Sequence, residues 1–221
     1  ATESPKTATA NRFAFIPPKP PDVVIIVSLS CWPAASDRSR SCPYHPPTMD
    51  IADSPGADPP KPAYTDAGAI FGGDGTYRYR LSRTWAAGPT AVCVLLNPST
   101  ADATTDDPTV TRCVKYAAGM GFGRLLVVNL FALRSSDPSD LDAHPAPVGP
   151  ENDAHVAAAA RAADRVVVGW GNAGGKRGRE VARRLDVDLY AIGTTKAGHP
   201  RHPSRTPYDT TIERFSYGDG G

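Results

Sequence analysis

Four short apolar runs, separated by stretches of helical character, constrain the fold of this chain more than any other feature. Such runs are typical of strands that are covered on both faces. They cover residues 91–96, 125–128, 165–169 and 189–192. Capping residues, such as the Asp-Pro pair at 107–108, and Ala-rich or basic segments predict helices between them. These helices are expected over residues 107–119, 150–163 and 176–185.

A β-hairpin is expected before the first apolar run. Residues 69–81 contain a Gly-rich turn at 72–75, and their alternation predicts a buried face with Tyr79 and Leu81 and a polar face with Arg78 and Arg80. A hairpin followed by four strands with helices between them indicates an α/β protein. We therefore expect a three-layer sandwich with a mainly parallel central sheet and an N-terminal β-hairpin.

Proline is distributed unevenly, with 13 of the 23 prolines in residues 1–62. Such a segment buries too little apolar surface to offset its ordering entropy. We expect a disordered Pro-rich segment over residues 1–62, a single α/β domain over 63–215 and a flexible tail over 216–221. The first methionine is Met49. Residues 1–48 are therefore either an extension from a mis-assigned start or a flexible tail that binds a partner.

Charge and cysteine content exclude several classes of protein. The 24 basic and 23 acidic side chains give a net charge of +1, so nucleic-acid binding would need a local basic patch. The four cysteines lack metal-ligand spacing, which favours a reduced, cytoplasmic protein without a metal or cofactor. The apolar run at 23–29 is far shorter than the roughly 20 residues that span a bilayer. We expect a monomer that does not contact membranes.

Candidate binding residues follow each predicted strand, where open α/β sheets bind ligands. Asn129 ends an apolar run, and its amide can donate to and accept from a base edge at once. Asn97 and Pro98 could instead form only a strand-ending turn, and Asp107 only a helix cap. The candidates for substrate binding are Pro98, Ser99, Asn129, Phe131, Trp170, Lys196 and Arg201.

Two further segments suggest chemistry. A Gly-rich turn leads into the basic helix, where backbone N–H groups could hold a phosphate, although its spacing matches no phosphate-binding motif. The candidates for phosphate binding are Gly174, Gly175, Lys176 and Arg177. A solvated helix face is the alternative. His199 and His202 lie in a stiff His-Pro-Arg-His-Pro loop, and no third ligand at diagnostic spacing supports a metal.

Several short motifs occur together over residues 70–205. They are Tyr-Arg-Tyr at 77–79, Asn-Pro-Ser-Thr-Ala-Asp at 97–102, Asp-Pro-Thr at 107–109, Asn-Leu-Phe-Ala-Leu-Arg at 129–134, Gly-Pro-Glu-Asn-Asp at 149–153, Trp-Gly at 170–171 and Gly-His-Pro-Arg-His-Pro at 198–203. This combination resembles DUF1643, a bacterial and phage domain-of-unknown-function family. That resemblance supplies no biochemical activity.

The order of elements is also distantly similar to the uracil-DNA glycosylase superfamily. In that superfamily an Asn or Asp after the first strand handles the attacking water, an Asn after the second pairs with a flipped base, and a His in a His-Pro loop assists departure of the base. The resemblance implies these roles for Asn97, for Asn129, and for His199 or His202. Leu95 and Ser99 stand where the first-turn motif has glycine.

N-glycosidic bond cleavage needs a held base, stabilisation of its developing charge and a placed water. Asp102 is the candidate for electrostatic support of a cationic sugar. We therefore expect an N-glycosylase-like enzyme that acts on a modified base or nucleotide, with Asn97, Asp102, His199 and His202 as its catalytic residues. The alternatives are a non-catalytic nucleotide- or DNA-binding module, and a hydrolase or transferase of free nucleotides.

Overall fold

The computed structural model describes residues 59–72, 74–208 and 210–218. The expectations for the Pro-rich segment and for a start at Met49 concern residues that lie, up to residue 58, outside this range. Half of the expected tail, residues 219–221, also lies outside it.

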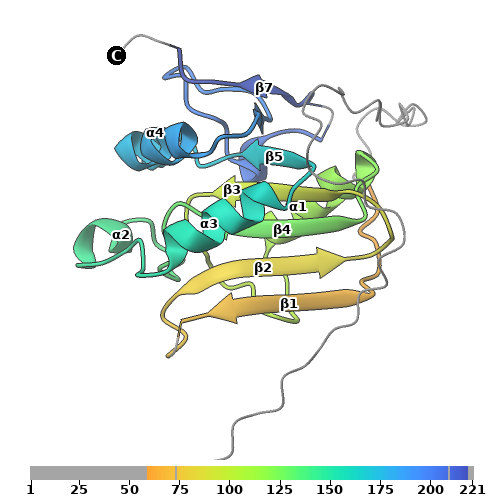
Figure 1. Cartoon of the computed structure of the whole chain (residues 1–221), viewed down its shortest axis with the longest axis horizontal. Helices are drawn as coiled ribbons and strands as arrows, with labels where there is room; N and C mark the ends of the chain where they lie inside the picture. Colours follow the sequence, from red (N-terminus) through yellow and green to blue (C-terminus); the bar gives the residue numbers. More distant parts are fainter. Residues whose placement is uncertain (1–58, 73, 209, 219–221) are drawn as a thin grey trace, which may run out of the picture. The chain divides into compact units, whose positions relative to one another are not determined.

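The described residues form one seven-stranded sheet in the order β1-β2-β4-β3-β5-β6-β7 (Figure 1). The strands are β1 (Asp66–Phe71), β2 (Arg78–Thr84), β3 (Thr90–Leu95), β4 (Arg124–Asn129), β5 (Arg165–Val168), β6 (Leu189–Ala191) and β7 (Glu213–Phe215). The helices are α1 (Pro108–Gly119), α2 (Asp140–Ala143), α3 (Asn152–Arg161) and α4 (Gly175–Arg184), with short 3₁₀ turns η1 (Asn172–Gly174) and η2 (Pro203–Arg205). The predicted hairpin, core strands and longer helices are confirmed.

The sheet is mixed, so the prediction of a mainly parallel sheet is not confirmed as a whole. Strands β4, β3, β5 and β6 run parallel in that order, which accounts for three of the six pairings. The pairs β1–β2, β2–β4 and β6–β7 are antiparallel. The hairpin adds two antiparallel pairings at one side of the sheet. Strand β7, which has only three residues and no periodic signal, adds the third at the other side.

The strands bury both faces because successive side chains point to opposite sides. On one face, Val92 and Val94 pack in a cluster that includes Val156 of α3 and Val181 of α4. On the other face, a cluster with Ala91, Cys93 and Leu95 of β3 includes residues of α1. Helices α3 and α4 therefore cover one face and α1 covers the other (Figure 1). The buried apolar runs in the sequence reflect this double cover.

A β-bulge in the hairpin changes which face Arg78 lies on. Ile70 pairs with Arg80, but the next residue, Phe71, pairs with Arg78, so the β2 strand has one extra residue at this point. Tyr79 stacks on His155 of α3, at a centroid distance of 4.9 Å. Arg78 points to the α1 side and is 2% exposed. The expectation that Arg78 lies on a polar face is therefore wrong.

Helix α4 packs closely on Trp170, which is 1% exposed. A Cβ atom at Gly178 would lie 2.4 Å from Nε1 of Trp170, and a Cβ atom at Gly174 would lie 2.0 Å from its ring. Both glycines are therefore explained by the close approach of backbone and indole.

Among the described residues, no helix combines the length and the hydrophobicity that crossing a bilayer requires.

We expect Gly178→Ala to lower the free energy of unfolding by about 2 kcal/mol or more, because the added methyl group collides with the indole. Gly119→Ala is the matched control, since a Cβ atom at this helical position meets nothing within 4 Å. It should leave stability unchanged or raise it by up to about 1 kcal/mol. Urea unfolding of both variants measures the difference, and equal stabilities would contradict the packing described for Trp170.

Candidate functional site

The carboxyl ends of β4, β3 and β5 form one edge of the sheet, and the loop after β3 leads there into α1. Leu95 pairs with Asn129, and Gly169 donates its N–H to the carbonyl of Val94 at 2.9 Å. Asp107 caps α1, with its Oδ1 accepting from the Val110 N–H at 2.8 Å, so the expected cap is confirmed. We call the α1 side of this edge the carboxyl-edge site.

Asn129 is the least satisfied polar side chain at this edge. It is 1% exposed, and neither its Oδ1 nor its Nδ2 has a hydrogen-bond partner among the described residues. Burying such a group without partners costs about 1–3 kcal/mol. The nearby Asn152 contrasts with it, because its Nδ2 donates to the carbonyls of Asn129 and Leu130 at 2.9 and 3.0 Å. Asn152 fixes the backbone there, whereas the Asn129 amide is left for another partner.

Arg78 brings a buried positive charge to the same corner of the site. Its Nη1 donates to the Ala101 carbonyl at 2.7 Å, while its Nε has no partner among the described residues. It forms no ion pair within the described part of the chain. Burial lowers the pKa of Arg78 to about 10, and the negative charge of Asp107 opposes this shift. The side chain therefore stays cationic at neutral pH. A buried guanidinium without a carboxylate partner is suited to an anionic or carbonyl-bearing ligand.

Arg83, on the same strand, is fully paired and anchors the loop that leads to α1. Its Nε contacts Oδ1 of Asp106 at 2.7 Å, and its Nη2 donates to the Asp102 carbonyl at 2.7 Å. Lys61 contacts Oδ2 of Asp106 at 2.7 Å, and the Tyr64 hydroxyl donates to the same oxygen. Burial alone would raise the pKa of Asp106, but hydrogen bonds from Lys61, Tyr64 and Arg83 outweigh burial and lower it.

Asn97 ties the loop after β3 to the loop after β4. Its Nδ2 donates to the carbonyl of Ser135 at 2.8 Å and to that of Pro98 at 3.1 Å. The hydroxyls of Ser99 and Ser136 lie 3.1 Å apart and add a second link. Both of the Asn97 bonds use the amide nitrogen. The two hydrogen bonds fix the orientation of the amide, and its Oδ1 takes part in neither of them.

Asp102 lies in the same loop and folds back on its own backbone. Its Oδ1 accepts from the N–H groups of Thr104 and Thr105, both at 2.8 Å. These backbone hydrogen bonds hold the pKa of Asp102 below its usual value. Its carboxylate is therefore ionised at neutral pH and held in a fixed turn.

The two candidate histidines lie in different surroundings. A Cβ atom at Gly169 would meet Pro203 at 2.9 Å and Leu95 at 3.4 Å, which places the loop of His202 over the α1 side of the edge. Burial lowers the pKa of His202, the charge of Arg205 adds to this, and Asp107 opposes it. His199 instead contacts the Tyr217 hydroxyl through its Nδ1, at 3.1 Å. The Tyr217 hydroxyl in turn accepts a hydrogen bond from Nε1 of Trp170, at 3.0 Å. Trp170 belongs to the core cluster on the α3 and α4 face of the sheet.

The side chains of the remaining candidates lie in other surroundings. Trp170 is enclosed in the core with α4, and Phe131 packs against that core. Lys196 is exposed, and Nε of Arg201 donates to the Thr194 carbonyl at 2.8 Å. Of the expected phosphate-binding set, Gly174 ends η1 and Gly175 begins α4, Lys176 is exposed, and Arg177 pairs with Asp153 and Glu180.

The structure thus brings Asp102, Asn129 and His202 to the α1 side, it adds Arg78, and it places Asn97 in the loop after β3 at the same edge of the sheet. The Tyr-Arg-Tyr motif contains Arg78 but gave no sign that its side chain lies at this site, because regular alternation puts residues 78 and 83 on opposite faces of a strand. Within the described residues, no group of three or more His, Cys, Asp or Glu side chains is placed to hold a metal ion.

We expect Asp106→Asn to lower the free energy of unfolding at neutral pH by about 3 kcal/mol, because it leaves the Arg83 charge buried and unpaired. Folding lowers the pKa of Asp106. The ionised carboxylate therefore stabilises the fold at any pH above the pKa of the unfolded chain, about 3.9, and this contribution is lost as the pH falls through the pKa of the folded state. The gap between wild type and variant should therefore narrow below about pH 4.

Urea unfolding as a function of pH measures that gap. Asp142→Asn, at an exposed position of α2, removes the same charge as a control and should change stability by no more than about 0.5 kcal/mol. A gap that stays constant or widens in acid would contradict the role given to Asp106.

Comparison with known proteins identifies a family and nothing finer. The family model described as "Protein of unknown function (DUF1643)" matches residues 78–204, which include β2 to β6 and every residue of the carboxyl-edge site. No curated protein and no solved structure gives a significant match, so the similarity to uracil-DNA glycosylases has no support from these comparisons. The chain belongs to the DUF1643 family.

Proposed function

We propose that this protein binds a nucleobase, in a nucleotide or in a nucleic acid, at the carboxyl-edge site. The observation on which the proposal rests is Asn129, a buried amide whose donor and acceptor both lack a partner among the described residues. Nucleobase edges present donors and acceptors side by side, and one carboxamide can bind such a pair with two hydrogen bonds. A bound base would offset the cost of burying the amide unpaired.

Arg78 supports a ligand that bears negative charge or carbonyl oxygens. Its guanidinium points to the same side of the sheet, on the strand next to β4, and has no carboxylate partner within the described residues. Base carbonyls and phosphates both accept hydrogen bonds from such a group. The α1 N-terminus adds a partial positive charge at the same edge, although Asp107 already caps it.

Hydrolysis of the N-glycosidic bond is the second candidate function, and the orientation of Asn97 favours it. With its nitrogen tied to Ser135, the Asn97 oxygen could position an attacking water. The ionised Asp102 could stabilise a cationic sugar, and His202, kept neutral by burial, could donate to the departing base. Action on free nucleotides is the other alternative, and it predicts that binding does not depend on oligonucleotide length.

We expect Asn129→Ala to abolish nucleobase binding without loss of stability, because it removes a polar group that has no partner among the described residues. Titration calorimetry with the deoxynucleoside monophosphates, uridine monophosphate and single-stranded oligonucleotides measures binding. Asn152→Ala is the matched control, and its loss of two buried hydrogen bonds should lower the free energy of unfolding by about 1–3 kcal/mol. Failure of the wild-type protein to bind any of these ligands at low salt would overturn the proposal.

The hydrolytic alternative predicts that oligonucleotides containing uracil or other modified bases lose that base on incubation with the protein. Asn97→Ala should then abolish release, yet leave binding of the same oligonucleotide within about threefold, because it removes the acceptor for water and no contact to the base. Asn172→Ala, at an exposed asparagine after β5, is the control. If bound oligonucleotides release no base, the hydrolytic function is excluded and the binding function stands.

A further inference from the structure

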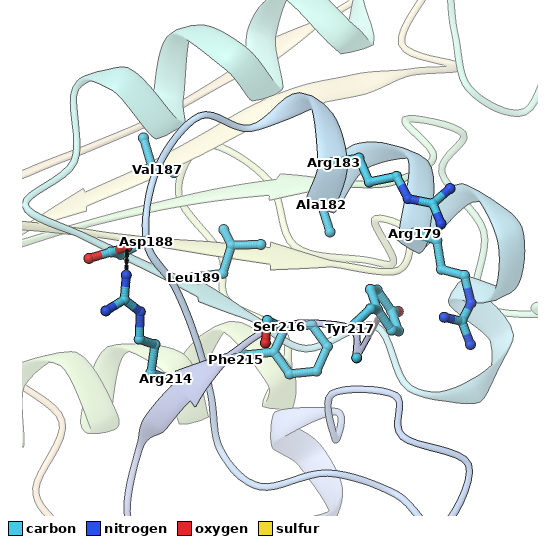
Figure 2. Close-up of a pocket in the computed structure, with 11 residues that line it drawn as sticks. Arg179, Ala182, Arg183, Val187, Asp188, Leu189, Arg214, Phe215, Ser216 and Tyr217 are labelled. Atoms are coloured by element: carbon cyan, nitrogen blue, oxygen red, sulfur yellow. Dashed lines mark hydrogen bonds and ion pairs between the residues drawn. The ribbon is translucent and has the colours of Figure 1, made fainter. Parts of the chain in front are cut away.

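A pocket of about 530 Å³ lies between α4 and the segment that follows β7 (Figure 2). Ala182, Leu189 and Phe215 supply the apolar part of a lining that is otherwise largely polar, and Tyr217 forms part of its wall. Arg179 and Arg183 lie at one end, whereas Arg214 and Asp188 lie at the other and pair with each other (Figure 2). The volume is in the range of pockets that hold small molecules. None of these residues belongs to the carboxyl-edge site.

Helix α4 has two basic flanks, and only one of them is neutralised. Arg184 contacts Asp153 at 2.8 Å and Glu180 at 2.7 Å. Arg177 contacts Glu180 at 3.3 Å and also pairs with Asp153. This network of two arginines and two carboxylates ties α4 to α3 and leaves no net charge on that flank.

The flank that faces the pocket keeps its charge. The Arg179 guanidinium lies 4.4 Å from the centre of the Tyr217 ring, and it has no carboxylate partner among the described residues. Arg183, one helical turn further on, forms no ion pair with any described residue. Like charges at positions i and i+4 repel and destabilise a helix. Two guanidinium groups held on one flank beside a cavity are therefore suited to share an anion.

We propose that this pocket binds a phosphomonoester that has an apolar body. The phosphate accepts hydrogen bonds from Arg179 and Arg183, and the apolar body covers Leu189 and Phe215. Asp188 neutralises Arg214 at the other end, so the phosphate is assigned to the α4 end. Arginine is suited to this role because its planar group presents paired donors to phosphate oxygens. The site is additional to the nucleobase site and does not depend on it.

Titration calorimetry of the full chain with phenyl phosphate tests the proposal. We expect phenyl phosphate to bind more tightly than inorganic phosphate, because its ring covers the apolar lining. Arg183→Gln should weaken binding of phenyl phosphate by about tenfold or more. Arg184→Gln removes the same charge from the next residue of the same helix, on the flank that is already neutralised, and should change binding by less than about threefold.

Four results would overturn the proposal. The first is that phenyl phosphate does not bind at millimolar concentration, and the second is that it binds no more tightly than inorganic phosphate. The third is that Arg183→Gln and Arg184→Gln weaken phenyl phosphate binding equally. The fourth is that oligothymidylate without a terminal phosphate binds more tightly than phenyl phosphate. The last result would assign the arginines to a nucleic-acid strand. Asn129→Ala should leave phenyl phosphate binding unchanged, so that failure of the nucleobase site and failure of this pocket can be distinguished.

Discussion

The buried ion pair between Arg83 and Asp106 is the interaction on which the geometry of the carboxyl edge depends. Arg83 is 0% exposed, and its donors are shared between one carboxylate and several loop carbonyls. An ion pair in this environment contributes specificity of position more than net stability. It holds the loop between β3 and α1 against β2, and the start of α1 and its cap at Asp107 follow from that placement.

The fold could be predicted from sequence largely because its signals are local. Apolar runs defined the four parallel strands, and the Asp-Pro pair defined the start of α1. Strand β7 could not be predicted, since three residues have no measurable period. Similarly, nothing local shows that His202 lies beside α1 while His199 bonds to Tyr217, because that separation depends on a partner 18 residues from His199 along the chain.

The candidate site was predicted less completely than the fold. Strand ends correctly indicated where Asn97 and Asn129 lie relative to the sheet. They did not show that Asn97 uses its nitrogen to bind a neighbouring loop while Asn129 has no partner within the described residues. The two asparagines differ in burial and in their tertiary hydrogen bonds, because Asn129 is buried and Asn97 is only partly buried. Residue type therefore indicated the candidate residues, and their hydrogen bonds in the structure distinguish between them.

The bulge in β2 has a consequence for how this family can vary. Because one extra residue turns Arg78 from the α3 face of the sheet toward α1, the charge at the carboxyl edge is set by backbone spacing as well as by side-chain identity. A single-residue deletion in the hairpin would keep every arginine and still empty that corner of its guanidinium. The length of the hairpin is thus as informative as its composition when relatives are compared, and an alignment that places a gap there would pair residues with different roles.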